Sequence, residues 1–107
     1  MVALTQVGRG CCQIDCRNRR GRLRKGRKVT GIVFINNGSE MLVTTNDSRC
    51  RLISLDDFSM TFKYGGLRNN DMQIKASCGS NGERVICGSE NRHVYVWRTR
   101  HEYVNVA

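Results

Sequence analysis

The sequence predicts an all-β fold made of short antiparallel strands. Short apolar runs rich in β-branched residues recur along the chain, and clusters of Gly, Asn, Asp and Ser separate them. No window keeps the 3.6-residue period of an amphipathic helix. The 107 residues give room for one small domain, and because the chain contains no proline we expect its turns to be made by Gly, Asn, Asp and Ser.

Four strands are expected in order after residue 28. The first run is apolar and β-branched, the second apolar, the third alternates Cys, Leu and Ser with Arg, Ile and Leu, and the fourth is weaker and precedes Gly65-Gly66. They lie at residues 29–34, 41–45, 50–55 and 60–64. Turns are predicted between them at 36–39, 46–48 and 56–57. The pattern is that of a four-stranded meander.

The order of residue classes in residues 29–53 recurs later in the chain. When the sequence is shifted by 44 residues, residues 29–53 match the later stretch without a gap, apolar on apolar and turn on turn. Met41-Leu42-Val43 falls on Val85-Ile86-Cys87, although only Asn37 and Gly38 are matched by identical residues. A shift of this size lies within the ~40–45-residue period of a four-stranded propeller blade.

The second copy resembles the second-to-third-strand hairpin of a WD40 repeat. It reads Cys87-Gly88-Ser89-Glu90-Asn91, two more residues, then Val94-Tyr95-Val96-Trp97. In such repeats a Ser or Thr, an Asp in the turn, an upstream His and the strand-end Trp form hydrogen bonds within one blade. The resemblance implies that the structural blade positions of this chain are Thr45, Asp47, Ser89, Asn91 and Trp97. Both networks are incomplete, because Ile53 stands at the first Trp position, Asn91 at the second Asp position, and Lys25 and Asn69 near the His positions.

Longer stretches resemble one group within this family, the WD-repeat 44 or rabphilin-11-like proteins. They read GRKVTGI, LVTTNDSRCRL, KYGGLRN, MQIKAS and VICGSENRHVYVW, and with them the resemblance extends over roughly residues 12–98. It implies a non-enzymatic scaffold for protein–protein interaction, with a possible link to membrane trafficking. In the animal member of the group, the region that binds a small GTPase lies outside the propeller. Since no residue here matches that region, GTPase binding is not carried over.

The resemblance implies about two four-stranded antiparallel blades of an incomplete WD40-type propeller across residues 1–107. The expected parts are an outer strand of a preceding blade in 1–16 (Cys12–Cys16), a basic loop in 17–28, a first blade in 29–66 and an incomplete second blade in 67–107. A propeller closes with about four to eight blades. We therefore expect a piece of a larger propeller, which self-associates when it is expressed alone.

The basic loop is the main candidate site for anion or partner binding. The net charge is +9, and residues 17–28 hold eight basic side chains and no acid, which leaves ten basic against nine acidic residues elsewhere. The eight candidates are Arg17, Arg19, Arg20, Arg22, Arg24, Lys25, Arg27 and Lys28. They could bind an acidic protein, nucleic acid or anionic lipid, or act as a nuclear localisation signal, and a solvated loop without a partner is the alternative. The segment has no aromatic residue for stacking on single-stranded bases.

Other chemistry is not supported by the sequence. Ser89, His93 and Asp47 are the residue types of a hydrolytic triad, but Gly-x-Ser-x-Gly is absent and two of them occupy blade positions, so we expect no enzyme and no cofactor. Cys11-Cys12-x-x-x-Cys16 lacks a paired C-x-x-C and a nearby His, so no metal site is expected and the cysteines should pack as small apolar residues.

Six cysteines without a secretory signal predict a reducing, cytoplasmic location. No apolar run approaches the ~20 residues of a membrane span. The prediction is a protein-interaction scaffold; the alternative is an anion-binding module that uses the basic loop.

Overall fold

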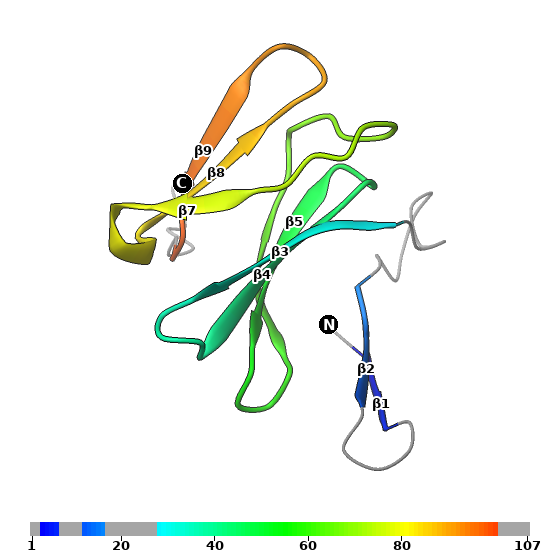
Figure 1. Cartoon of the computed structure of the whole chain (residues 1–107), viewed down its shortest axis with the longest axis vertical. Coiled ribbons are helices and arrows are strands. Elements are labelled where there is room, and N and C mark those ends of the chain that lie inside the picture. Colours follow the sequence, from blue (N-terminus) through cyan, green and yellow to red (C-terminus); the bar gives the residue numbers. More distant parts are fainter. Residues whose placement is uncertain (1–2, 7–11, 17–27, 101–107) are drawn as a thin grey trace, which may run out of the picture.

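The computed structural model describes residues 3–6, 12–16 and 28–100, and this part of the chain is built from β-strands (Figure 1). Its strands form three antiparallel sheets of two, four and three strands. Among the described residues the one helical element is a single 3-10 turn, η1 (Ser80–Gly82). The predicted all-β fold is therefore confirmed.

The four-stranded sheet contains the four strands that the apolar runs predicted, paired in chain order. They are β3 (Val29–Ile35), β4 (Glu40–Thr45), β5 (Arg49–Ser54) and β6 (Met60–Tyr64). The β3–β4 turn places Asn36, Asn37 and Gly38 at φ values of 52°, 56° and 82°. Asn and Gly adopt such left-handed backbone with the least strain, and this is why the chain reverses here.

The three-stranded sheet repeats the hairpin of the first sheet. It consists of β7 (Ser77–Gly79), β8 (Arg84–Gly88) and β9 (Val94–Arg98). β8 begins 44 residues after β4, and β8 pairs with β9 as β4 pairs with β5. The described part of this sheet has three strands, one fewer than a complete blade, and β9 forms an open edge.

The N-terminal sheet differs from the expected single strand. β2 (Cys12–Asp15) pairs with a further strand, β1 (Ala3–Gln6), in an antiparallel hairpin. The sequence of β1 mixes Ala, Leu, Thr and Gln without β-branched alternation, so the pattern did not single it out. Cys16, which follows β2, is half-buried and feels the charges of Arg51 and Asp47. The end of β2 therefore lies near one face of the first blade.

The main core lies between the four-stranded and the three-stranded sheet. The buried apolar side chains that form it are Ile35, Leu42, Cys50, Leu52, Tyr64, Leu67, Ala76, Val85 and Cys87. The Tyr64 hydroxyl donates a hydrogen bond of 2.5 Å to the carbonyl of Thr99, and the rings of Tyr64 and Trp97 lie 5.6 Å apart. The Cys50 and Cys87 thiols also interact across this boundary, which raises the pKa of Cys50. The two sheets thus share one core, as neighbouring blades do.

Candidate protein-interaction surface at the loop face

Three connections meet at one end of the two blades and form a surface that we call the loop face (Figure 1). They are the β4–β5 turn (residues 46–48), the connection between the two sheets (residues 65–76) and the β8–β9 turn (residues 89–93). Their backbones are joined directly. Ser48 donates its N–H to the carbonyl of Asn69 at 3.1 Å, and Glu90 donates its N–H to the carbonyl of Arg68 at 2.8 Å.

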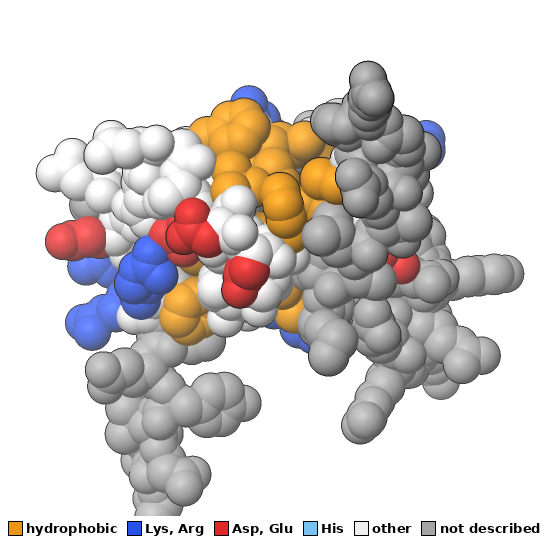
Figure 2. Space-filling view, turned by 90° about the horizontal axis from the view of Figure 1, so that it is seen from below, with side chains coloured by type: hydrophobic (Ala, Val, Ile, Leu, Met, Phe, Trp, Pro, Cys, Tyr) orange, Lys and Arg blue, Asp and Glu red, His pale blue; other side chains and the backbone are white. Residues whose placement is uncertain are grey.

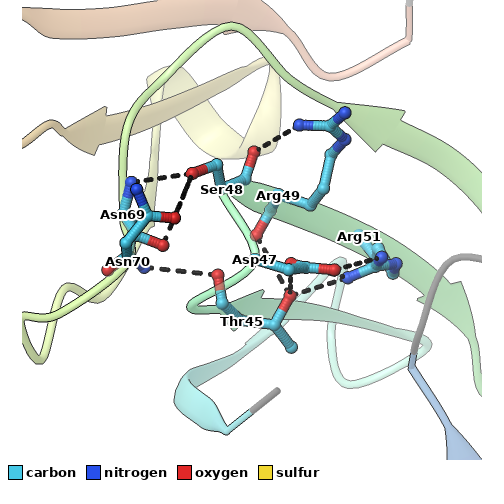
Figure 3. Close-up of polar contacts among 7 residues, drawn as sticks. All are labelled: Thr45, Asp47, Ser48, Arg49, Arg51, Asn69 and Asn70. Atoms are coloured by element: carbon cyan, nitrogen blue, oxygen red, sulfur yellow. Dashed lines mark hydrogen bonds and ion pairs between the residues drawn. The ribbon is translucent and has the colours of Figure 1, made fainter. Parts of the chain in front are cut away.

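A buried polar network holds the β4–β5 turn (Figure 3). Thr45 donates its hydroxyl to Asp47 Oδ1 at 2.5 Å, and Arg51 donates to Thr45 Oγ1 at 2.6 Å. Arg51 also forms an ion pair with Asp47, with 2.9 Å between Nη2 and Oδ2. These three residues are at most 1% exposed, so the turn is fixed by groups that water does not reach.

The ionic state of Asp47 follows from this network. Burial by itself would raise the pKa of the Asp47 carboxyl, but hydrogen bonds from Arg51 and Thr45, together with the positive charge of Arg51, outweigh it and hold the pKa below its ordinary value. Asp47 therefore stays ionised and paired. The carboxylate serves the fold of the turn and is not free to act as a base.

Sequence reasoning placed Thr45 and Asp47 at blade positions, but it did not assign a role to Arg51. The structure brings all three together. A signal was present, because the alternation along β5 puts Arg51 on the same face as Ile53, which is fully buried. A charged residue in a strand with two buried faces requires a partner, and Asp47 in the preceding turn is that partner.

The connection between the sheets is anchored to this turn through Asn69. Asn69 is fully buried and donates its side-chain amide to the carbonyl of Thr45 at 3.3 Å. Its backbone N–H donates to the hydroxyl of Ser48 at 3.0 Å (Figure 3). The sequence placed Asn69 near the His position of the second copy. In the structure its side chain reaches the turn of the first copy.

The β8–β9 turn is fixed to the same connection. Ser89 Oγ accepts the N–H of Arg68 at 2.8 Å, and Asn91 donates its side-chain amide to the Tyr95 hydroxyl at 2.9 Å. Trp97 stacks on Tyr95, with ring centroids 5.9 Å apart, and contacts Tyr64 with its ring tilted by 43°. Ser89 thus bonds to Arg68 and accepts the N–H of Asn91 at 3.5 Å, whereas Asn91 also bonds to Tyr95 and His93. Trp97 is held by aromatic contacts.

Glu90 holds an exposed part of the connection between the sheets. Its Oε2 accepts three backbone N–H groups, from Asn70 at 3.0 Å, Asp71 at 2.8 Å and Met72 at 2.9 Å. The bonds from Asp71 and Met72 lower the pKa of the Glu90 carboxyl most, so it stays ionised as an acceptor. Sequence analysis did not find this role, because the contact joins a turn to a loop about twenty residues earlier.

The fixed connections present mixed side chains to solvent. Met72 is 63% exposed although it is apolar, and it lies in the segment that Glu90 holds. Around it the connection and the β8–β9 turn expose Arg68, Asp71, Arg92 and His93. The loop face therefore presents the apolar side chain of Met72 among charged side chains, on a backbone that hydrogen bonds hold in place.

The other sequence-predicted residues are distributed as follows. Arg17, Arg19, Arg20, Arg22, Arg24, Lys25 and Arg27 lie outside the described residues. Lys28 is exposed, and its carbonyl accepts the N–H of Asn46 at 3.0 Å. Asp47 and Ser89 bond to different partners, and His93 bonds to Asn91 in an exposed turn, so no triad is formed among them.

Within the described ranges, His, Cys, Asp and Glu do not gather in a group of three or more that could hold a metal ion. Cys12 is exposed, whereas Cys50 and Cys87 lie in the core. Burial raises the pKa of the Cys16 and Cys78 thiols. In the same described part, no helix has the length and apolar character needed to cross a membrane.

Comparison with known proteins agrees with the repeat and the paired sheets. The chain is 47% identical to WD repeat-containing protein 44 of Xenopus laevis over 90 residues, which is 84% of this chain and 10% of that protein. It is 28% identical to Autophagic-related protein 16.2 of Caenorhabditis elegans over 82 residues, 70% of this chain and 14% of that protein. No family model matches the sequence.

The chain thus spans about a tenth of the length of the Xenopus relative, and similarity to a WD-repeat protein suggests a protein-interaction scaffold. Proteins of the WD-repeat type are generally non-enzymatic. The sequence identity, the 44-residue repeat of the hairpin and the two antiparallel sheets packed face to face identify this chain as a WD-repeat polypeptide that carries part of a WD40-type β-propeller.

Proposed function

We propose that this chain is a non-enzymatic scaffold element that binds other proteins through its loop face, with Met72 as the central contact. The observation that supports this proposal is the clamp formed by Glu90. Its carboxylate fixes the backbone of residues 70–72 and so holds an apolar side chain in solvent. An exposed apolar group on a fixed backbone loses little conformational freedom when a partner covers it.

The chemistry of the loop face suits a protein partner. Met and Arg are enriched in protein–protein interfaces, and Met adapts its shape to different partners. Arg68 and Arg92 lie exposed on the two connections that Ser89 and Glu90 join. We therefore expect a partner with an apolar pocket for Met72 and acidic groups at its rim.

The cellular setting is a second part of the proposal. The six cysteines of the sequence and the free thiols of the described residues favour a reducing, cytoplasmic location. The resemblance to the rabphilin-11-like group supports a role connected with membrane trafficking, and the C. elegans relative is an autophagic-related protein. A fluorescent fusion of the chain, viewed beside endosomal and autophagosomal markers, tests this part.

The interaction is tested by comparing two variants in one capture experiment. Met72→Asp should remove specific partners from the proteins captured by the tagged chain, because a charge replaces the central apolar contact. Phe34→Asp is the matched control, because Phe34 is 64% exposed and lies on β3 beside the β3–β4 turn, away from the loop face. Equal capture by both variants would reject the loop face as the binding surface.

Residues 17–28 remain a separate proposal for anion binding. Eight basic side chains without an acid attract phosphates, acidic proteins or anionic membranes. Binding through this segment should weaken steeply with salt and disappear when its arginines and lysines are replaced by glutamine. Binding through the loop face should survive both changes.

A further inference from the structure

A cavity opens between the two blades, away from the loop face and near the β3–β4 turn. Its volume is about 430 Å³, and it is lined by Asn36, Asn81, Gly82, Glu83, Arg84, Arg98, Thr99 and Arg100. In the view from below, basic side chains gather on the left, where β7 and η1 lie in Figure 1, and acidic side chains lie beside them (Figure 2). Its lining comes from the β3–β4 turn on one side and from η1, β8 and the end of β9 on the other.

Two arginines of this cavity stand opposite each other. Arg84 and Arg98 are direct cross-strand partners in the β8–β9 ladder, and both are exposed. Among the described residues, neither side chain has a hydrogen bond or an ion pair. Like charges in directly opposed positions destabilise a sheet. The pair is therefore an unfavourable arrangement for folding that a bound anion would relieve.

A third guanidinium is already fixed at the rim. Arg100 forms an ion pair with Glu40, whose side chain is 9% exposed and also accepts a hydrogen bond from the side-chain amide of Asn36. The Arg100 side chain is 57% exposed, so part of its donor set faces solvent. Glu40 thus holds Arg100 beside the cavity while it balances the charge of only this one arginine.

The shape of the cavity depends on a close approach of two turns. Gly82 has a φ of 86°, and a Cβ atom there would lie 3.2 Å from Asn36 Oδ1. Thr99 donates its hydroxyl to the carbonyl of Gly82 at 2.6 Å, which ties the end of β9 to the η1 turn. These contacts fix the backbone around the arginines, so that little ordering is needed when a ligand enters.

We propose that this cavity binds a phosphate monoester, with Arg84 and Arg98 as its main donors and Arg100 as the third. A guanidinium presents paired N–H donors that match phosphate oxygens, and two opposed arginines match a dianion. The lining also carries the carboxylate of Glu83, so its three arginines stand in excess over one acid. The volume falls within the ~300–1,000 Å³ of small-ligand sites, so a phosphorylated small molecule or a phosphoinositide headgroup can enter. This anion site is independent of the protein-binding role of the loop face.

Phosphate binding is measured by the fluorescence of Trp97, which precedes Arg98 on β9, and by thermal unfolding. Fluorescence of the full 107-residue chain is followed during titration with inorganic phosphate and with inositol trisphosphate, against chloride at equal ionic strength. Flotation with phosphatidylcholine vesicles, with and without a phosphatidylinositol phosphate, distinguishes a lipid headgroup from a soluble ligand. We expect saturable binding, and a melting temperature that rises with phosphate but not with chloride.

The decisive comparison uses two double variants that remove the same charge. Arg84→Gln/Arg98→Gln should bind phosphate roughly tenfold more weakly or worse, because two charge-assisted contacts are lost. Its melting temperature in phosphate-free buffer should equal or exceed that of the parent chain, since the repulsion is removed. Arg68→Gln/Arg92→Gln, on the loop face, should bind phosphate like the parent. Equal weakening in both variants, or no saturable binding by the parent to phosphate, inositol trisphosphate or vesicles, would overturn the proposal.

Discussion

Replacement of Asp47 by alanine tests whether the buried polar network holds the first blade. The change removes the nearer acceptor of the Thr45 hydroxyl and the carboxylate paired with Arg51. Both Asp47 and Arg51 are 1% exposed, so water cannot replace the lost carboxylate without opening the turn. Arg51 would be left as a buried cation that has lost its ion pair with Asp47.

The expected loss is large compared with the stability of a small domain. Removal of one partner of a buried ion pair costs about 3–5 kcal/mol. Domains of this size have unfolding free energies of about 5–15 kcal/mol, so Asp47→Ala should remove a large share of the total. The hydroxyl of Thr45 also loses its bond to Asp47 and keeps only the carbonyl of Arg49 at 3.5 Å, which adds to the loss.

Urea unfolding followed by far-UV circular dichroism measures this loss. Asp57→Ala is the control, because Asp57 is also a turn aspartate that accepts hydrogen bonds, from the N–H and hydroxyl of Ser59, but is exposed. A double variant, Asp47→Ala/Arg51→Met, removes the buried cation too and should recover part of the stability. The reasoning is refuted if Asp47→Ala lowers the unfolding free energy no more than Asp57→Ala does. It is also refuted if the loss in the double variant equals the sum of the losses in Asp47→Ala and Arg51→Met, each measured alone.

The same network predicts a dependence on pH. Because the folded pKa of Asp47 lies below its unfolded value of about 3.9, the stabilisation is complete above that value and is lost as the pH falls through the folded pKa. The difference in unfolding free energy between the parent chain and Asp47→Ala should therefore be constant near neutral pH and shrink below about pH 4. A difference that stays constant down to pH 2 would contradict this.

Three further outcomes are expected. Trp97→Ala should lower the unfolding free energy by about 3 kcal/mol, because Trp97 packs on two tyrosines. This value is at the lower end for a buried Trp, since Trp97 is only partly buried. An unchanged urea midpoint would contradict the placement of Trp97. Cys12 should react quickly with iodoacetamide, whereas Cys50 and Cys87, 0% and 1% exposed, should react only after denaturation, as mass spectrometry of the labelled chain would show. The chain expressed alone should self-associate through the open edge of β9, and Val96→Lys, at a position 53% exposed, should shift it toward monomer in size-exclusion chromatography; a parent chain that elutes as a monomer at all concentrations would refute this.

Several features of the fold could be predicted because they depend on neighbours in sequence. Asn36-Asn37-Gly38 favours a tight turn, and the alternation along residues 49–54 favours a strand. β7 carries little signal of its own, because three residues, Ser77–Gly79, make too short a pattern to fix its bounds. β1 was missed for a similar reason, and the expected single strand at Cys12–Cys16 became a hairpin.

The candidate sites could be predicted only in part. Thr45 and Asp47 stand two residues apart, so their hydrogen bond is a local event that the repeat pattern indicates. The clamp of Glu90 on residues 70–72 and the cavity between Asn36 and Arg98 join segments that are far apart in the sequence. No local pattern encodes such contacts, because they exist only after the two sheets have packed.

The sequence by itself determined the strands, the tight turns and the 44-residue repeat, since backbone preference and apolar alternation act over a few residues. Only the tertiary structure decided which side chains meet. Packing of the two sheets through Leu52, Tyr64 and Val85 brings the connection between them against both tight turns and leaves Met72 in solvent. The same packing sets Arg84 and Arg98 beside a cavity that the first sheet closes. The physical reason is that burial of apolar side chains determines how the two sheets pack. The loops and charged side chains at the ends of the sheets come into contact as a result of that packing.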